Sequence, residues 1–110
     1  MDPSAANTAQ PDLNAALDRL WARFLPEIRE RVSIIESAVQ SLAAGTLKIE
    51  EKEAAASAAH KLAGVLGTFS LQRGTEVSRE LELQFTGATG NPSNLAALAA
   101  ELRQLIESRA

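Results

Sequence analysis

The chain has 110 residues, a net charge of −3 at pH 7 and no cysteine. This acidic balance lacks the positive field that binds nucleic acid, and the absence of cysteine excludes disulfides and thiolate metal sites. The first ten residues lack the features of a signal peptide, and no apolar run approaches the ~20 residues that cross a bilayer. We therefore expect a cytoplasmic protein with no membrane segment. Its apolar residues are mostly alanine and leucine, which favours helices over sheets.

The N-terminal part predicts a leader followed by a helix. Residues 1–11 are rich in small and polar side chains, so we expect a disordered or loosely attached leader before a single domain at 12–110. Asp12 can cap a helix whose apolar side chains recur at helical spacing, namely Leu13, Leu17, Leu20, Trp21 and Phe24. Pro26 either kinks this helix or begins the next one as its first-turn residue.

Two helices are predicted between Pro26 and residue 68. The first ends at Gly45, which suits a left-handed cap, and its apolar stripe is Ile28, Val32, Ile35, Val39 and Leu42. The second begins around Ile49 with several glutamates, whose charge complements the helix dipole. It continues through His60 to about Leu66 or Thr68.

Two more helices complete the predicted fold. Ser70 is the predicted N-cap of a helix whose stripe is Val77, Leu81 and Phe85. After a glycine-containing loop at 86–90, Asn91 and Pro92 suit the cap and first turn of a last helix, with a stripe of Leu95, Leu98, Leu102, Leu105 and Ile106. Amphipathic helices joined by short connections predict an all-α fold. We expect an antiparallel four-helix bundle with an additional N-terminal helix or helical extension.

His60 is the only histidine, and the helical period places it opposite the apolar stripe. At about 100° per residue, Leu62, Leu66 and Phe69 fall on the far side of the helix from His60. Gly64 and Gly67 lie within about 40° of it, and Ala56 lies about as close. Because glycine in a helix costs roughly 0.5–1 kcal/mol relative to alanine, two glycines on one face indicate close approach of another molecule.

The alternatives to a functional histidine are a core histidine and an inert one at the surface. The position of His60 opposite the apolar stripe argues against a core histidine. A metal site would need further histidine or cysteine ligands, and the chain has none. Neutral imidazole is nucleophilic at cellular pH. Gly64 could instead serve tight helix packing, and Gly67 could end the helix. Phe69, Leu71 and Leu81 are predicted core residues.

The signature around this histidine resembles that of histidine phosphotransfer (HPt) domains of phosphorelays. It reads His60-x-Leu62-x-Gly64-x-x-Gly67-x-Phe69-x-Leu71, followed by Leu81-Glu82, and it covers residues 60–82. The resemblance implies a four-helix bundle that carries a phosphoryl group on His60. The family commonly has a lysine three residues after the histidine, where this chain has Ala63.

Several supporting residues are predicted around His60. Lys61 and Ser57 could reach a phosphoryl group on the imidazole, although surface lysines usually only meet solvent. We expect a partner to dock on a surface of small residues, namely Ala56, Ala63, Gly64 and Gly67. The sequence offers neither a nucleotide-binding loop nor a catalytic triad, so we expect a carrier and not an enzyme.

By this resemblance, His60 exchanges a phosphoryl group with the aspartate of a response-regulator receiver domain. The receiver would supply the acidic pocket and Mg²⁺, and a sensor or hybrid histidine kinase would act upstream. We expect a monomer that binds no cofactor and no nucleic acid. Two alternatives remain: a helical-bundle adaptor that carries no phosphate, and a degenerate HPt domain that docks on receivers but transfers poorly.

Overall fold

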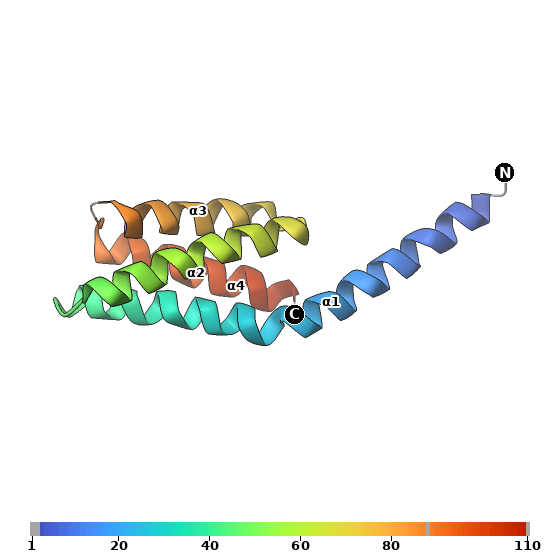
Figure 1. The fold of residues 1–110 in the computed structure, drawn as a ribbon. Helices are drawn as coiled ribbons and strands as arrows, with labels where there is room; N and C mark the ends of the chain where they lie inside the picture. Colours follow the sequence, from blue (N-terminus) through green and yellow to red (C-terminus); the bar gives the residue numbers. More distant parts are fainter. Residues whose placement is uncertain (1–2, 88, 110) are drawn as a thin grey trace.

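A computed structural model describes the backbone of residues 3–87 and 89–109, with side chains from Leu13 onward. It contains four helices, α1 (Pro3–Ala43), α2 (Ile49–Thr68), α3 (Gln72–Thr86) and α4 (Pro92–Arg109). The helices run alternately up and down, so that neighbours in sequence are antiparallel (Figure 1). The described residues contain no strand. The prediction of an all-α bundle is confirmed.

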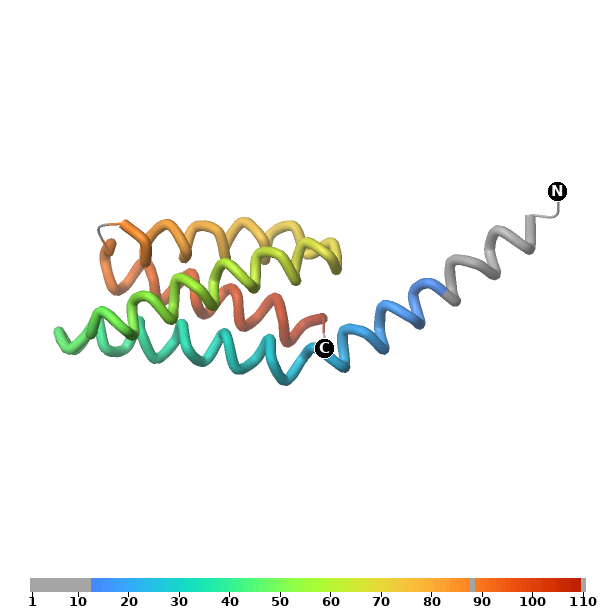
Figure 2. Tube along the Cα trace, viewed as in Figure 1, coloured from blue at the N-terminus to red at the C-terminus, as the bar shows by residue number. Residues whose placement is uncertain are grey.

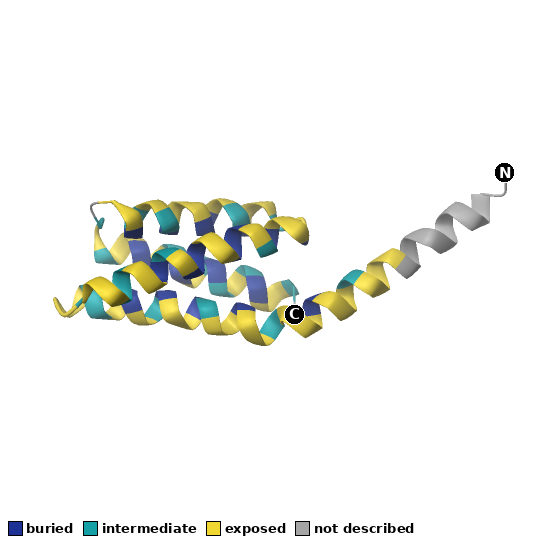
Figure 3. Cartoon of the chain, in the orientation of Figure 1, coloured by how far each residue is buried: buried dark blue, intermediate teal, exposed yellow. Residues whose placement is uncertain are grey.

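The four helices enclose one apolar core. α2 and α4 each pack against both α1 and α3, which lie diagonally opposite one another. The predicted stripes from Ile28 onward face inward (Figure 3), and their fully buried members include Ile28, Leu62, Leu81, Leu102 and Ile106. Burying each such side chain stabilises the fold by about 1.5–3 kcal/mol. Because these stripes fix the rotation of every helix, they also fix which residues face the solvent. The stripe predicted for the first helix is wrong in part, because Leu13, Leu20 and Phe24 are exposed and only Trp21 is buried.

α1 is longer than the other helices and continues beyond the bundle. It runs unbroken through Pro26, so of the two alternatives for Pro26 the start of a separate helix is wrong. Its portion before Trp21 leads away from the other helices (Figures 1 and 2), and most side chains described there are exposed. This portion is the predicted helical extension. The helix begins at Pro3, so position 12 lies inside it and the prediction that Asp12 is its N-cap is wrong. The side chains of the predicted leader, residues 1–11, and of Asp12 lie outside the described residues.

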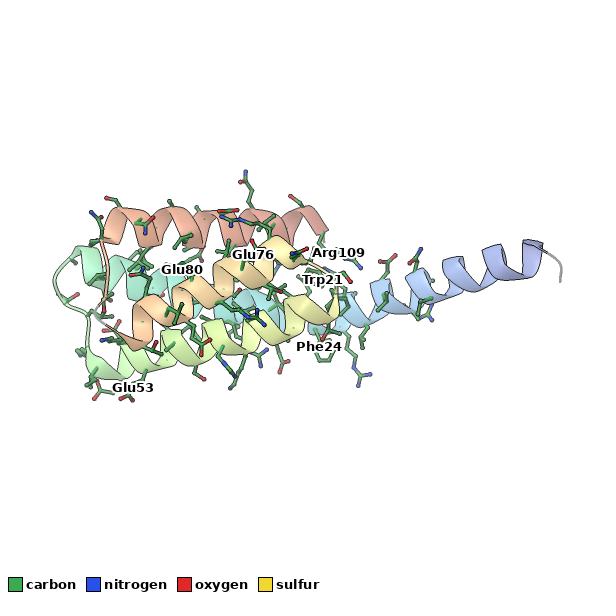
Figure 4. All side chains as sticks on the ribbon, turned by 90° about the horizontal axis from the view of Figure 1, so that it is seen from above. Trp21, Phe24, Glu53, Glu76, Glu80 and Arg109 are labelled. Carbon is green, nitrogen blue, oxygen red and sulfur yellow. The ribbon has the colours of Figure 1, made fainter. Side chains whose placement is uncertain are left out.

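Trp21 anchors α1 where it joins the bundle. Its ring meets Phe69 edge-on, with the centroids 5.1 Å apart, and is only 3% exposed. The Arg109 guanidinium lies 5.3 Å from the Trp21 centroid, as a cation–π contact (Figure 4). This cluster joins the ends of α2 and α4 to α1.

Charged pairs across the surface fix α4 against its neighbours. Between α1 and α4, Arg29 pairs with Glu107 and Arg103 pairs with Glu36. Arg73 of α3 pairs with Glu101 of α4. The hydrogen bonds from Arg73 hold the pKa of Glu101 below its usual value. Water screens exposed pairs of this kind, so they set the register of the helices more than the stability of the fold. No helix in the described part of the chain is long and apolar enough to cross a membrane.

Two predicted helix ends are confirmed. Gly45 has a φ of 73°, and the amides of Gly45 and Thr46 donate to the carbonyls of Leu42 and Ser41. This is a Schellman motif with glycine at its left-handed position. At the start of α4, the Asn91 side chain accepts a hydrogen bond of 2.8 Å from the amide of Ser93. Pro92 is the first helical residue.

The end of α2 corrects two predictions. Ser70 is not an N-cap but the left-handed residue of a second Schellman motif, with a φ of 59°. The amides of Ser70 and Leu71 donate to the carbonyls of Gly67 and Leu66. Gly67 therefore lies inside the last turn and does not end the helix. Serine is a weak signal here because a left-handed residue is usually glycine, whereas serine usually marks an N-cap.

We expect Ser70→Gly to raise the free energy of unfolding by about 1 kcal/mol, because glycine avoids the steric cost of a left-handed φ. Chemical denaturation of the variant and the wild type measures the difference. Ser70→Ala is the matched control, since it keeps the Cβ and should change stability by less than about 0.5 kcal/mol. Equal stability of the glycine and alanine variants would contradict this assignment.

Candidate functional site

His60 lies in the middle of α2, a helix held firmly at its start. The backbone amide of Lys48 and the hydroxyl of Ser41 donate to the two carboxylate oxygens of Glu51, at 3.1 and 2.8 Å. These two hydrogen bonds lower the pKa of Glu51, and the one from Ser41 has the larger effect. Ala59 and Leu62 are fully buried on either side of His60 in the sequence. The His60 side chain is 74% exposed, which excludes the core-histidine alternative.

Glu82 of α3 orients the imidazole. Its Oε2 lies 2.9 Å from His60 Nδ1. Glu82 follows the buried Leu81, and that burial fixes the rotation of α3 so that Glu82 meets α2. An ionised carboxylate can only accept hydrogen bonds, so Nδ1 is the donor. The neutral imidazole then carries its lone pair on Nε2, which is the nucleophilic atom.

A shallow depression surrounds this pair between α2 and α3. Its lining consists of His60, Ala63 and Gly64 from α2, and of Arg79, Glu82 and Leu83 from α3. A Cβ added at Gly64 would meet nothing within 4 Å, so Gly64 is not a packing glycine. Ala63 is 8% exposed, and Leu83 is 66% exposed. Gly64 therefore leaves the α2 side of the surface beside His60 without a protruding side chain, whereas the α3 side carries the exposed apolar side chain of Leu83.

The other predicted residues lie at different positions. Lys61 and Ser57 are exposed, but they line a second depression that α2 forms with α1, where Glu27 and Arg31 also lie. Ala56 is half-buried and lines a third depression, near the start of α2 and the end of α3. Gly67 is exposed, and a Cβ there would make ordinary contact with Thr75. Only His60, Ala63 and Gly64 of the predicted residues share the His60 depression. The roles of the others stay predictions.

Sequence reasoning assigned no role to Arg79 or to Glu82. Both lie on α3 three residues apart, a spacing that places them on one face of a helix. This spacing and, for Glu82, its place in the Leu81-Glu82 part of the signature are the available signals, but neither says which helix the face meets. Among the residues with described side chains, no group of three or more histidines, aspartates or glutamates is placed to hold a metal ion. The site thus consists of one oriented nucleophile beside an exposed cation.

Comparison with known proteins agrees with this geometry. The family model described as "Hpt domain" matches residues 19–109, which include all of α2, α3 and α4. Protein RcaC of Microchaete diplosiphon is 32% identical over 79 residues. The aligned segment covers 72% of this chain and 12% of that relative, so the chain spans about an eighth of the relative's length. No solved structure gave a significant match. With the family model covering most of the chain, the protein belongs to the Hpt domain family.

Proposed function

We propose that His60 accepts a phosphoryl group from the aspartyl phosphate of a response-regulator receiver domain and passes it on to such an aspartate. The observation that carries this proposal is the contact between His60 Nδ1 and Glu82, which leaves Nε2 directed to an exposed surface. Family membership supports a role in histidine phosphotransfer. The low surface at Gly64 supports the approach of a whole domain.

The transfer step uses the lone pair of His60 Nε2. A bond forms between Nε2 and phosphorus while the bond between phosphorus and the aspartyl oxygen breaks, and the receiver keeps the electron pair as a carboxylate. The imidazole ring gains positive charge, and Glu82 stabilises it by accepting the hydrogen bond from Nδ1–H. The reverse step returns the phosphoryl group to an aspartate.

Catalysis in this proposal belongs to the partners. The receiver contributes the acidic pocket and its Mg²⁺, and a sensor or hybrid histidine kinase supplies the phosphoryl group to the relay. This chain contributes the nucleophile and the docking surface, without a cofactor of its own. It is a phosphoryl carrier and not an enzyme.

Incubation with a radiolabelled, phosphorylated receiver tests the proposal. We expect label to move to this protein, and the new linkage to be labile in acid and stable in base, as a phosphorus–nitrogen bond is. Addition of an unlabelled receiver should then remove the label. Failure of every receiver tested, together with failure of a small phosphodonor such as phosphoramidate, would contradict the proposal.

Glu82 gives a specific prediction for the same assay. Glu82→Ala removes the acceptor of the Nδ1 hydrogen bond, so we expect transfer from the receiver to slow by about 10- to 100-fold, the size of effect known for hydrogen-bond partners that orient metal-bound histidines. Stopped-flow or quench kinetics measure the rate, and circular dichroism checks the fold.

Glu80→Ala is the matched control for Glu82→Ala. Glu80 lies on the same helix, is exposed (Figure 4), and accepts a hydrogen bond from Gln84 instead of from His60. Its loss should leave the transfer rate within about twofold, since exposed substitutions of this kind have small effects. Equal rates in the two variants would show that Glu82 does not orient the nucleophile.

A degenerate HPt domain is the second candidate function, and Ala63 is the observation that favours it. Alanine at this position supplies no charge to a phosphoryl group on His60. Such a domain would bind a receiver without efficient transfer. Measured binding to a receiver without labelling of His60 would support this alternative over the first.

A further inference from the structure

A phosphoryl group on His60 needs a positive charge beside it. The group brings close to two negative charges at neutral pH, as other protein phosphates do. Glu82 adds another negative charge, since it lies 2.9 Å from the same imidazole. The two like charges repel, so a nearby cation would lengthen the life of the phosphorylated state.

Arg79 is the cationic side chain in the lining of the His60 depression. It lies one turn before Glu82 on α3, and it is exposed. Among the described side chains, no carboxylate lies within 4 Å of its guanidinium, whereas Arg73 on the same helix pairs with Glu76 and Glu101. Within the part of the chain whose side chains are described, the charge of Arg79 is therefore not engaged in an ion pair.

The other cation near His60 in the sequence faces a different part of the surface. Lys61 lines the depression between α1 and α2, together with Glu27, Glu30 and Arg31. Ala63 does share the His60 depression, but its methyl group carries no charge. An arginine presents five N–H donors in a planar fork that matches phosphate oxygens, and its long side chain can turn toward the imidazole.

We propose that Arg79 binds the phosphoryl oxygens on phosphorylated His60 and holds the group in the depression between α2 and α3. This inference rests on the proposed function and names the cation of that site. The arginine acts on the phosphorylated state, after the bond between Nε2 and phosphorus has formed.

The lifetime of the phosphorylated protein tests this inference. The wild type and Arg79→Gln are phosphorylated with phosphoramidate, freed of donor and followed by ³¹P NMR in the absence of any receiver. We expect the phosphohistidine signal of Arg79→Gln to decay about tenfold faster. Tenfold corresponds to about 1.4 kcal/mol, the size of a hydrogen bond to a charged group. Arg79→Lys keeps the charge without the fork and should recover part of the lifetime.

A titration supplies a readout that a structural role would not move. We expect the ³¹P shift of the phosphohistidine to titrate at lower pH in the wild type than in Arg79→Gln, because a neighbouring guanidinium favours the dianion. Arg23→Gln is the control for net charge. Arg23 is exposed on α1, the helix diagonally opposite α3, so this variant should match the wild type in both measurements.

The outcomes separate this inference from the proposed function. A wild type that takes up no phosphoryl group would overturn both. Normal phosphorylation with equal lifetimes and titrations in the wild type and Arg79→Gln would overturn the role of Arg79 alone. A lifetime lost in Lys61→Gln but kept in Arg79→Gln would assign the cation to Lys61. Slower transfer from a receiver without a change in lifetime would assign Arg79 to docking.

Discussion

His60→Gln should abolish phosphate acceptance while the fold is preserved. The imidazole is 74% exposed and its one described polar partner is Glu82, so stability should change by no more than about 0.5–1 kcal/mol. Glutamine has no nucleophilic ring nitrogen, so labelling from a phosphorylated receiver should fall to background. Labelling and denaturant unfolding are measured on the same preparation.

Both readouts of this variant are informative. Since His60 is the only histidine, no second imidazole can take over the label. Acid-labile label that persists on His60→Gln would show that the phosphoryl group is carried elsewhere. A loss of several kcal/mol would show that His60 serves the core and not the surface, contrary to its exposure.

Gly64→Leu should block transfer from a receiver without destabilising the bundle. Gly64 lies one turn after His60 on the same face, and a Cβ there has open space around it. Replacing a helical glycine should raise stability by up to ~1 kcal/mol. The added side chain would stand beside the imidazole and displace the docked receiver. A misplacement of about 1 Å can slow a reaction by about 100-fold, and we expect a loss of at least that size.

Small donors and a smaller substitution control this experiment. Phosphoramidate needs less room than a receiver, so its reaction with Gly64→Leu should be slowed much less. Gly64→Ala should gain helix stability and keep most of its transfer rate, because a methyl group adds little height. Transfer from the receiver to Gly64→Leu at the wild-type rate would place the docking surface elsewhere. Unfolding of this variant would make Gly64 a packing residue.

Periodicity predicted the parts of the fold that depend on burial. The stripes of Ile28, Leu81 and Leu102 face the core because a helix repeats every 3.6 residues and each bundle helix buries one face. The same geometry placed His60 and Gly64 toward solvent, and the structure confirms both. These predictions succeeded because they need only the spacing within one helix.

The contacts between helices were not predictable in this way. Glu82 meets His60 across 22 positions of sequence, and the contact depends on how α3 is rotated against α2. Lys61 lies next to His60 in the chain, yet a step of about 100° turns it toward α1. The prediction that Ser70 is an N-cap was wrong for a different reason. Serine is typical of an N-cap, and it seldom adopts the left-handed φ that it has here.

Identification of the phosphorylated nitrogen tests the proposed role of His60 directly. The ¹⁵N-labelled protein is phosphorylated, and the coupling between ³¹P and the ring nitrogens is measured by NMR. All imidazole signals come from His60, because the chain has no other histidine. We expect phosphorus on Nε2, with Nδ1 on the Glu82 side of the ring. Phosphorus on Nδ1, or on no histidine nitrogen at all, would contradict this expectation.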